Sequence, residues 1–234
     1  MKCTKIVMSA LLFSLFTTGC SQQKPTASTT TEPSESTAAA TTASTPTPTP
    51  AATPVADASS KAEEYVAKMD LKSKVEQLMV PSVRQWNGSD FTEMNDEVSS
   101  ILSQYHFGGI ILFAENMTSD SAQAINLTQS MQISTINGGG TPLFMGTDQE
   151  CGNVYRLLSG TDMPSSMALA ATGDPQNAYD TGNIISTELK ALGFNLDYAP
   201  DLDVNANPAN PVIGIRSYSD DGATVAEYAK QFTQ

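Results

Sequence analysis

Two pairs of carboxylates in this 234-residue chain have one residue between their members. Asp148 and Glu150 lie in TPLFMGTDQECGNVYRL, and Asp201 and Asp203 lie in NLDYAPDLDVNANPANPVIGIRSY. Residues two apart in an extended segment share a face, so such a pair could act as the acid and nucleophile that cleave a glycosidic bond. The spacing is common, and these aspartates could instead organise the turns that follow them. The residues alone leave both interpretations open.

Two arginines accompany these carboxylates. Arg156 lies among Val154, Leu157 and Leu158, and Arg216 lies in VIGIRSY. A guanidinium in apolar surroundings is expected to pair with a carboxylate or to reach a ligand, and its planar set of donors suits carboxylates and sugar hydroxyls. Both arginines are therefore candidate ligand-binding residues.

Metal chemistry is not indicated. His106 is the only histidine, and it precedes a pair of glycines at the start of a predicted strand, where a structural role is expected. Cys151 has no partner for an internal disulfide if Cys3 and Cys20 leave or are modified. One histidine and one cysteine make no ligand cluster, so we predict no metal and no cofactor.

The elements that must position these residues alternate along the chain. Short apolar runs predict strands at residues 78–80, 108–113, 143–145 and 194–198. Helical spacing and capping residues predict helices at residues 59–69, 70–77, 91–105, 122–136 (capped by Ser119), 165–171, 177–192 and 221–232. The alternation predicts an α/β fold with a parallel sheet.

Two architectures fit this alternation, an open doubly wound sheet and a (β/α)8 TIM barrel. No glycine-rich phosphate-binding motif follows any of the strands, and polar residues gather after the third and fourth, which favours the barrel. A barrel has eight strands in about 250 residues. We therefore expect only about the first four β/α units here, and unpaired edges on the first and fourth strands invite self-association.

The amino-terminal residues predict export. Lys2 and Lys5 precede an apolar run at residues 6–16, and small residues lead into Cys20. This pattern is typical of a bacterial lipoprotein signal peptide over residues 1–20, with Cys20 lipidated. Residues 21–58 are dominated by Ser, Thr, Ala and Pro and are expected to form a disordered linker to a folded domain at residues 59–234. The layout predicts a secreted protein anchored to the membrane at the cell surface.

The charge of the chain excludes one class of partner. The formal net charge is -13, whereas nucleic-acid binding requires a basic surface. We therefore expect no nucleic-acid partner.

Five stretches together resemble the amino-terminal domain of glycoside hydrolase family 3, over about residues 61–234. They are MDLKSKVEQLM, YHFGGIILF, PLFMGTDQECG with VYRL, MPSSMALAATGDP, and ELKALGFNLDYAPDLDVNANPANPVIGIRSY. The ending NPANPVIGIRSY resembles the bacterial β-N-acetylhexosaminidase branch of that family.

The resemblance implies roles that spacing does not supply. Asp148 and Arg156 match residues that hold sugar hydroxyls in the innermost subsite, and Arg216 matches a further substrate-binding arginine. In this branch a Lys-His pair, a histidine acid/base in a Gly-His-Gly loop and an aspartate nucleophile come later in the barrel. No catalytic residue is therefore expected within this chain, and the bond-breaking residues are expected beyond Gln234. Cys151 departs from the family's Glu-Gly-Gly, with only a local backbone adjustment expected.

The function implied is that of a surface-anchored glycosidase fragment. Its full-length relative would remove terminal N-acetylglucosamine from cell-wall fragments or chito-oligosaccharides, and the chain alone is expected to lack activity because retaining hydrolysis needs both a nucleophile and a proton donor. The alternative is a non-catalytic sugar-binding or structural lipoprotein.

Overall fold

The computed structural model describes residues 56–234, and its central element is a three-stranded parallel sheet. Strands β3 (Gly109–Ile111), β4 (Phe144–Thr147) and β5 (Leu196–Asp197) are ordered β3-β4-β5. Gly109 pairs with Phe144, and Gly146 pairs with Leu196. The signal peptide, Cys20 and nearly all of the predicted linker lie outside the described residues.

The first predicted strand, residues 78–80, is not a strand in the structure. The backbone N–H groups of Leu78 and Met79 donate to Val75 and Glu76, so this segment extends the turn after helix α2 (Leu71–Glu76). The segment still reaches β3 through single bonds, because the Met79 carbonyl accepts the Gly109 N–H and the Pro81 carbonyl accepts the Ile111 N–H. An isolated parallel bridge joins Ser82 to Ile111. The turn thus occupies the Leu78 and Met79 N–H groups, and no regular strand forms over residues 78–80.

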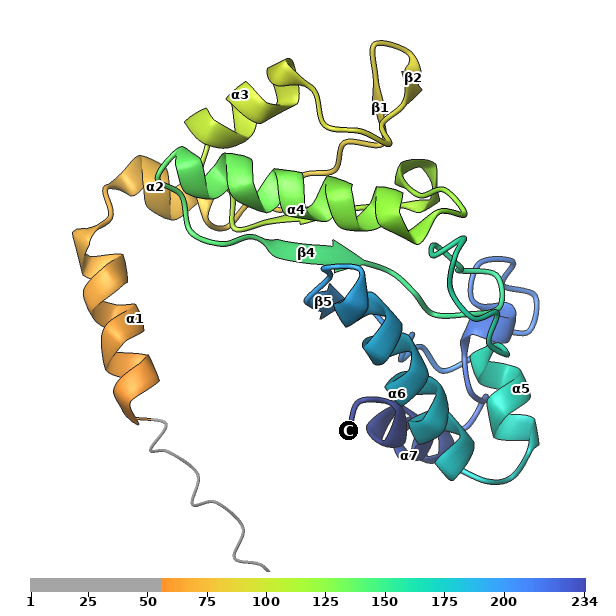
Figure 1. Cartoon of the computed structure of the whole chain (residues 1–234). Helices are drawn as coiled ribbons and strands as arrows, with labels where there is room; N and C mark the ends of the chain where they lie inside the picture. The colour runs from red at the N-terminus through yellow and green to blue at the C-terminus, as the bar shows by residue number, and fades with distance from the viewer. Residues whose placement is uncertain (1–55) are drawn as a thin grey trace, which may run out of the picture. The chain divides into compact units, whose positions relative to one another are not determined.

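The remaining elements are α1 (Ala56–Lys68), the hairpin strands β1 (Gln85–Trp86) and β2 (Ser89–Asp90), α3 (Asp96–Gln104), η1 (Ala114–Asn116), α4 (Ser121–Asn137), α5 (Ser166–Ala171), α6 (Gln176–Ala191), η2 (Gly214–Arg216) and α7 (Gly222–Phe232). The remaining helices lie near the predicted ranges, whereas the β1–β2 hairpin and the short helices η1 and η2 were not predicted. In Figure 1, α4 runs beside β4, and α6 packs against α7.

Side-chain caps set several helix starts. Asp70 caps α2 as predicted, and its Oδ1 accepts the Ser73 N–H at 2.7 Å. The cap of α4 is Asp120 rather than Ser119, because the Asp120 carboxylate accepts the Ala122 N–H at 2.9 Å. Both helices are therefore capped by an aspartate, whose negative charge is also stabilised by the positive end of the helix dipole.

Helix α3 starts later than the sequence predicts. Asn95 caps it by accepting the Val98 N–H at 2.9 Å, and the preceding Phe91 donates its N–H to the Arg84 carbonyl. This bond commits Phe91 to the end of the β1–β2 hairpin, where its ring is buried. The helical spacing over residues 91–105 therefore includes a buried residue that lies outside the helix.

The interior consists of two hydrophobic clusters. The first gathers residues of β3, β4, α3, α4 and α6, including the fully buried Leu112, Met131 and Met145. The second joins α5, α6 and α7 through Leu169, Ala178, Tyr218, Val225, Tyr228 and Ala229. Phe232 packs against both clusters. In the described part of the chain, no helix is long and apolar enough to span a bilayer.

Candidate functional site

The candidate site lies just beyond the carboxyl end of β4, where Asp148 follows the last residue of the strand. Its carboxylate accepts two hydrogen bonds from Arg156, one from Nε at 3.0 Å and one from Nη2 at 2.6 Å. Both side chains are about four-fifths buried, and the hydrogen bonds that Arg156 donates to Asp148 raise the pKa of the guanidinium. The pair fixes the plane of the Arg156 guanidinium, as fork-to-fork contacts do.

Glu150 makes a second pair of the same kind. Its carboxylate accepts from Arg216 Nε at 2.7 Å and from Nη2 at 2.8 Å, and its side chain is only 6% exposed. Asp148 and Glu150 therefore engage different arginines rather than forming an acid and nucleophile pair. Their spacing suggested that both carboxylates could act on one glycosidic bond. In the structure each carboxylate is instead bound by its own arginine.

The second carboxylate pair organises a loop. Asp201 Oδ1 accepts the Asp203 N–H at 3.0 Å, and its other oxygen lies 3.7 Å from Arg216 Nε. The neighbouring Asp201 raises the pKa of the Asp203 carboxyl. The Asp203 carbonyl accepts from the Ser217 hydroxyl at 2.6 Å, which joins this loop to the segment that carries Arg216. The turn-organising interpretation of these two aspartates is thus the one that fits.

Gln149 closes the loop between Asp148 and Arg156. Its side chain is completely buried, and Oε1 accepts the backbone N–H groups of Arg156 at 2.7 Å and Leu157 at 3.2 Å. The Arg156 backbone is therefore fixed by the residue next to Asp148 in the chain. Sequence reasoning did not single out this glutamine, because its role depends on the closed loop.

Cys151 occupies the tightest point of the loop. Its φ is 74°, in the left-handed region, and the following Gly152 has φ 58°. The cysteine that replaces the family's glycine is thus held in a conformation that suits glycine, and the expectation of only a local backbone adjustment stays a prediction. Burial raises the pKa of the Cys151 thiol to about 12.

Two residues at this edge of the sheet were missed by sequence reasoning. The Arg84 guanidinium carbon lies 3.6 Å from the centre of the Phe113 ring, and that of Arg156 lies 5.5 Å from the same centre. Arg84 also pairs with Glu115 at 3.5 Å. Both missed residues follow strand-like segments closely, and that position is the signal that could have identified them.

Asp197 is the third residue that sequence reasoning missed. It ends β5, and its Oδ1 accepts the Gln149 N–H at 2.9 Å. Burial raises its pKa to about 7, and the nearby charges of Asp148 and Glu150 raise it further. The available signal was a carboxylate inside the strand predicted at residues 194–198.

His106 has structural contacts. Its Nε2 lies 3.0 Å from the Gly138 carbonyl oxygen, and its backbone N–H donates to Glu76. It precedes β3, at the amino-terminal end of the parallel strands, whereas the candidate site lies at their carboxyl ends. In residues 56–234 no group of three or more His, Cys, Asp or Glu residues is placed to hold a metal ion.

The comparisons with known proteins identify the family. The model of the glycosyl hydrolase family 3 N terminal domain matches residues 70–234, a range that contains every candidate site residue above. The chain belongs to glycoside hydrolase family 3.

Relatives of this family 3 chain are hexosaminidases by name. It is 39% identical to β-hexosaminidase A of Pseudoalteromonas piscicida over 142 residues, which is 58% of this chain and 24% of that protein. It is 30% identical to β-hexosaminidase LpqI of Mycobacterium tuberculosis over 171 residues, which is 72% of this chain and 40% of that protein. The chain thus spans less than half of either relative.

A solved structure supports the α/β fold. The family 3 β-N-acetylglucosaminidase from a Paenibacillus species superposes with a TM-score of 0.63 at 40% identity, over 70% of this chain and 30% of that one. The predicted α/β class and family are confirmed.

Proposed function

We propose that this chain provides the sugar-binding part of a β-N-acetylhexosaminidase active site, with Asp148, Arg156 and Arg216 as the substrate-binding residues. The bidentate Asp148–Arg156 pair carries the proposal, because it presents a fixed guanidinium at the carboxyl end of a parallel strand. Within the described residues Nη1 of Arg156 donates no hydrogen bond, which leaves donors for sugar hydroxyls. The names of the relatives point to N-acetylglucosamine as the sugar.

The sheet is, in this proposal, part of a (β/α)8 barrel. Three parallel strands and the Ser82–Ile111 bridge account for four adjacent strand positions. The candidate residues follow these positions at one edge, as substrate-binding residues do in barrels.

Hydrolysis by the chain alone is not expected. Retaining glycosidases use two carboxyl groups about 5–5.5 Å apart, one as proton donor and one as nucleophile. Here Asp148 and Glu150 are each neutralised by an arginine. The bond-breaking residues of the full active site are therefore proposed to come from sequence outside these 234 residues.

Calorimetric titration of the chain with N-acetylglucosamine tests the binding function. We expect saturable binding that Arg156→Lys weakens by about tenfold or more, because an ammonium cannot make two parallel bonds to Asp148. Lys230→Ala, which removes a cation on α7, is the matched control and should bind like the parent chain. Absence of binding by the parent chain would refute the proposal.

An assay on a chromogenic N-acetylglucosaminide tests whether the chain carries out hydrolysis by itself. Binding without turnover supports a sugar-binding portion of the site or, in the alternative hypothesis, a non-catalytic surface lipoprotein. Turnover that Asp148→Ala abolishes would show that the chain carries its own catalytic residues and would contradict the proposal.

Anchoring at the bacterial cell surface through a lipid on Cys20 is part of the proposal. It is supported by the charged, apolar and small-residue order of residues 1–20. Metabolic labelling with a fatty acid should mark the chain, and Cys20→Ser should abolish the label. Labelling that persists in this variant would reject lipidation at Cys20.

A further inference from the structure

We propose that Asp197 is a positioning residue for the sugar-binding Asp148–Arg156 pair and that it acts through Gln149. The inference rests on the proposed function of that pair. It assigns no contact between Asp197 and the sugar.

Asp197 and Asp148 project from opposite faces of the sheet. A Cβ placed on Gly146 would lie 2.9 Å from the Tyr198 ring and 3.6 Å from Leu196 Cδ2, so these residues share one face. Side chains alternate along a strand, which puts Asp197 on the other face. Asp148 directly follows β4, two residues after Gly146, and we infer that it continues this alternation on the Gly146 face, because the Tyr198 N–H still pairs with the Thr147 carbonyl. Asp197 is therefore behind the candidate site.

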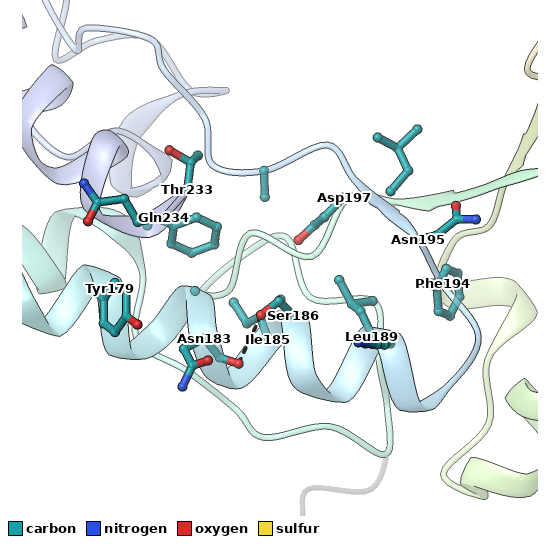
Figure 2. A pocket seen from close by; sticks show the side chains of 15 residues that line it. Tyr179, Asn183, Ile185, Ser186, Leu189, Phe194, Asn195, Asp197, Thr233 and Gln234 are labelled. Carbon is teal, nitrogen blue, oxygen red and sulfur yellow. Dashed lines mark hydrogen bonds between the residues drawn. The ribbon is translucent and has the colours of Figure 1, made fainter. Parts of the chain in front are cut away.

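The surroundings of Asp197 agree with this placement. Its side chain lines a cavity of about 550 Å³ between β5, α6 and the end of α7. Figure 2 shows the carboxylate pointing from the β5 backbone towards the helix that carries Ile185, Ser186 and Leu189. A general acid acting on a sugar beside Asp148 would need to face the other way.

The hydrogen bonds connect Asp197 to both members of the pair. Its Oδ1 accepts the Gln149 backbone N–H at 2.9 Å, immediately after Asp148 in the chain. The Gln149 side chain in turn accepts the Arg156 backbone N–H at 2.7 Å. Gln149 thus holds the backbone next to Asp148 and the backbone of Arg156, and Asp197 holds the Gln149 backbone.

Retention of a carboxylate here has a cost. Burial raises the pKa of Asp197 to about 7, which reflects the unfavourable desolvation of its charged form. An apolar residue would avoid that cost but would leave the Gln149 N–H without an acceptor. The bond to Gln149 is the contact that a carboxylate provides and an apolar side chain does not.

NMR of the whole chain tests the proposal without any sugar. The Arg156 Nε–H signal reports the ion pair directly, because a proton held between Nε and a carboxylate exchanges slowly with water. Asp197→Leu keeps the branched shape but removes the acceptor, whereas Asp197→Asn keeps an acceptor oxygen. We expect exchange of the Arg156 Nε–H to be about tenfold faster in the leucine variant and to be near the parent rate in the asparagine variant.

Asp180→Ala is the control, since it removes an exposed carboxylate from α6 that bonds only Gln176. Equal exchange rates in the parent chain, the leucine variant and this control would overturn the proposal. So would an unprotected Arg156 Nε–H in the parent, because no fixed pair would then exist. If the leucine variant does not fold, the Gln149 amide shift in the parent must follow the titration of Asp197, and an amide that does not respond overturns the proposal.

Sugar titration then separates the two proposals. If the parent binds N-acetylglucosamine, the leucine variant should bind about tenfold more weakly, and equal affinity would count against Asp197. If the parent does not bind, the sugar-binding function fails, while the exchange measurement still decides whether Asp197 positions the pair.

Discussion

Cys151 adopts a left-handed backbone conformation that normally favours glycine. Its φ of 74° costs an L-residue about 1–2 kcal/mol relative to glycine. The residue is nevertheless buried, at 2% exposure, and belongs to the first hydrophobic cluster. Strain and burial therefore act in opposite directions at this position.

The balance between strain and burial predicts an unusual order of stability among variants of Cys151. Cys151→Ala keeps the strain and loses the thiol contacts, so it should lower the free energy of unfolding by about 1 kcal/mol. Cys151→Gly relieves the strain and should be at least as stable as the alanine variant, which reverses the usual preference for alanine. Urea denaturation measures the order, and a glycine variant clearly less stable than the alanine variant would contradict it.

The Asp197 carboxyl predicts a pH dependence of stability. Its pKa is about 7 when folded and near 3.8 when exposed, so between these values the folded chain binds a proton that the unfolded chain does not. The contribution of Asp197 to stability is therefore full below about pH 4 and is lost as the pH rises through 7, by a few kcal/mol at most. Asp148 and Glu150, whose charges also raise this pKa, are present both in the parent chain and in a variant that changes only Asp197.

Asp197→Asn does not titrate and is the matched comparison. Its stability relative to the parent should increase between pH 5 and pH 8, as measured by urea denaturation in a series of buffers. A constant difference across this range would exclude a raised pKa at Asp197.

At the scale of elements, helices were predicted better than strands. The apolar spacing and capping aspartates of α2 and α7 lie within a few residues, so local sequence determines them. The contact of residues 78–82 with β3 depends on which backbone groups α2 has already used. That competition is not visible in a hydrophobic pattern.

The residues of the candidate site also differ in how well they could be predicted from the sequence. Asp148 and Arg156 lie eight residues apart on one loop, and motif resemblance was enough to select both. The partners of Glu150 and Gln149 are 66 and 48 residues distant, and spacing gave no hint of them. Arg84, Phe113 and Asp197 were missed because only the assembled sheet brings their strands to one edge.

The α6–α7 contact gives a prediction for these elements. A Cβ on Gly182 would lie 2.2 Å from the Phe232 carbonyl oxygen, so the helices can approach this closely only with glycine there. Gly182→Ala should lower the free energy of unfolding by about 1–3 kcal/mol as α7 is displaced. Gly222→Ala is the control, since its Cβ would meet only Val204 at 3.6 Å. Similar thermal stability of the two variants would argue against the close approach.

At the scale of the whole molecule, the apolar residues around α2 and the outer edge of β5 are uncovered in the described chain. Leu71, Val75 and Leu78 follow helical spacing and are 78%, 51% and 82% exposed. Within residues 56–234, β5 pairs only with β4 and leaves its other edge open. Exposed apolar surface and open edges both favour association.

We predict self-association that strengthens with salt, because screening reduces repulsion between chains of net charge -13. Light scattering after size exclusion should show a larger mass at high salt, and Leu71→Lys with Leu78→Lys should reduce it. Ile133→Lys with Ile136→Lys, on exposed positions of α4, is the matched control. A monomer at every salt concentration, or an equal effect of the control, would refute this prediction.

The two hydrophobic clusters carry different chromophores. Trp86, the only tryptophan in the sequence, packs against the first cluster, and Tyr218 and Tyr228 face each other in the second with ring centres 5.5 Å apart. Tryptophan emission therefore follows the loosening of the first cluster, and near-ultraviolet tyrosine signals include the second. Because Phe232 packs against both clusters, coincident transitions of these signals during denaturation would mean that the two halves of the interior melt as one cooperative unit.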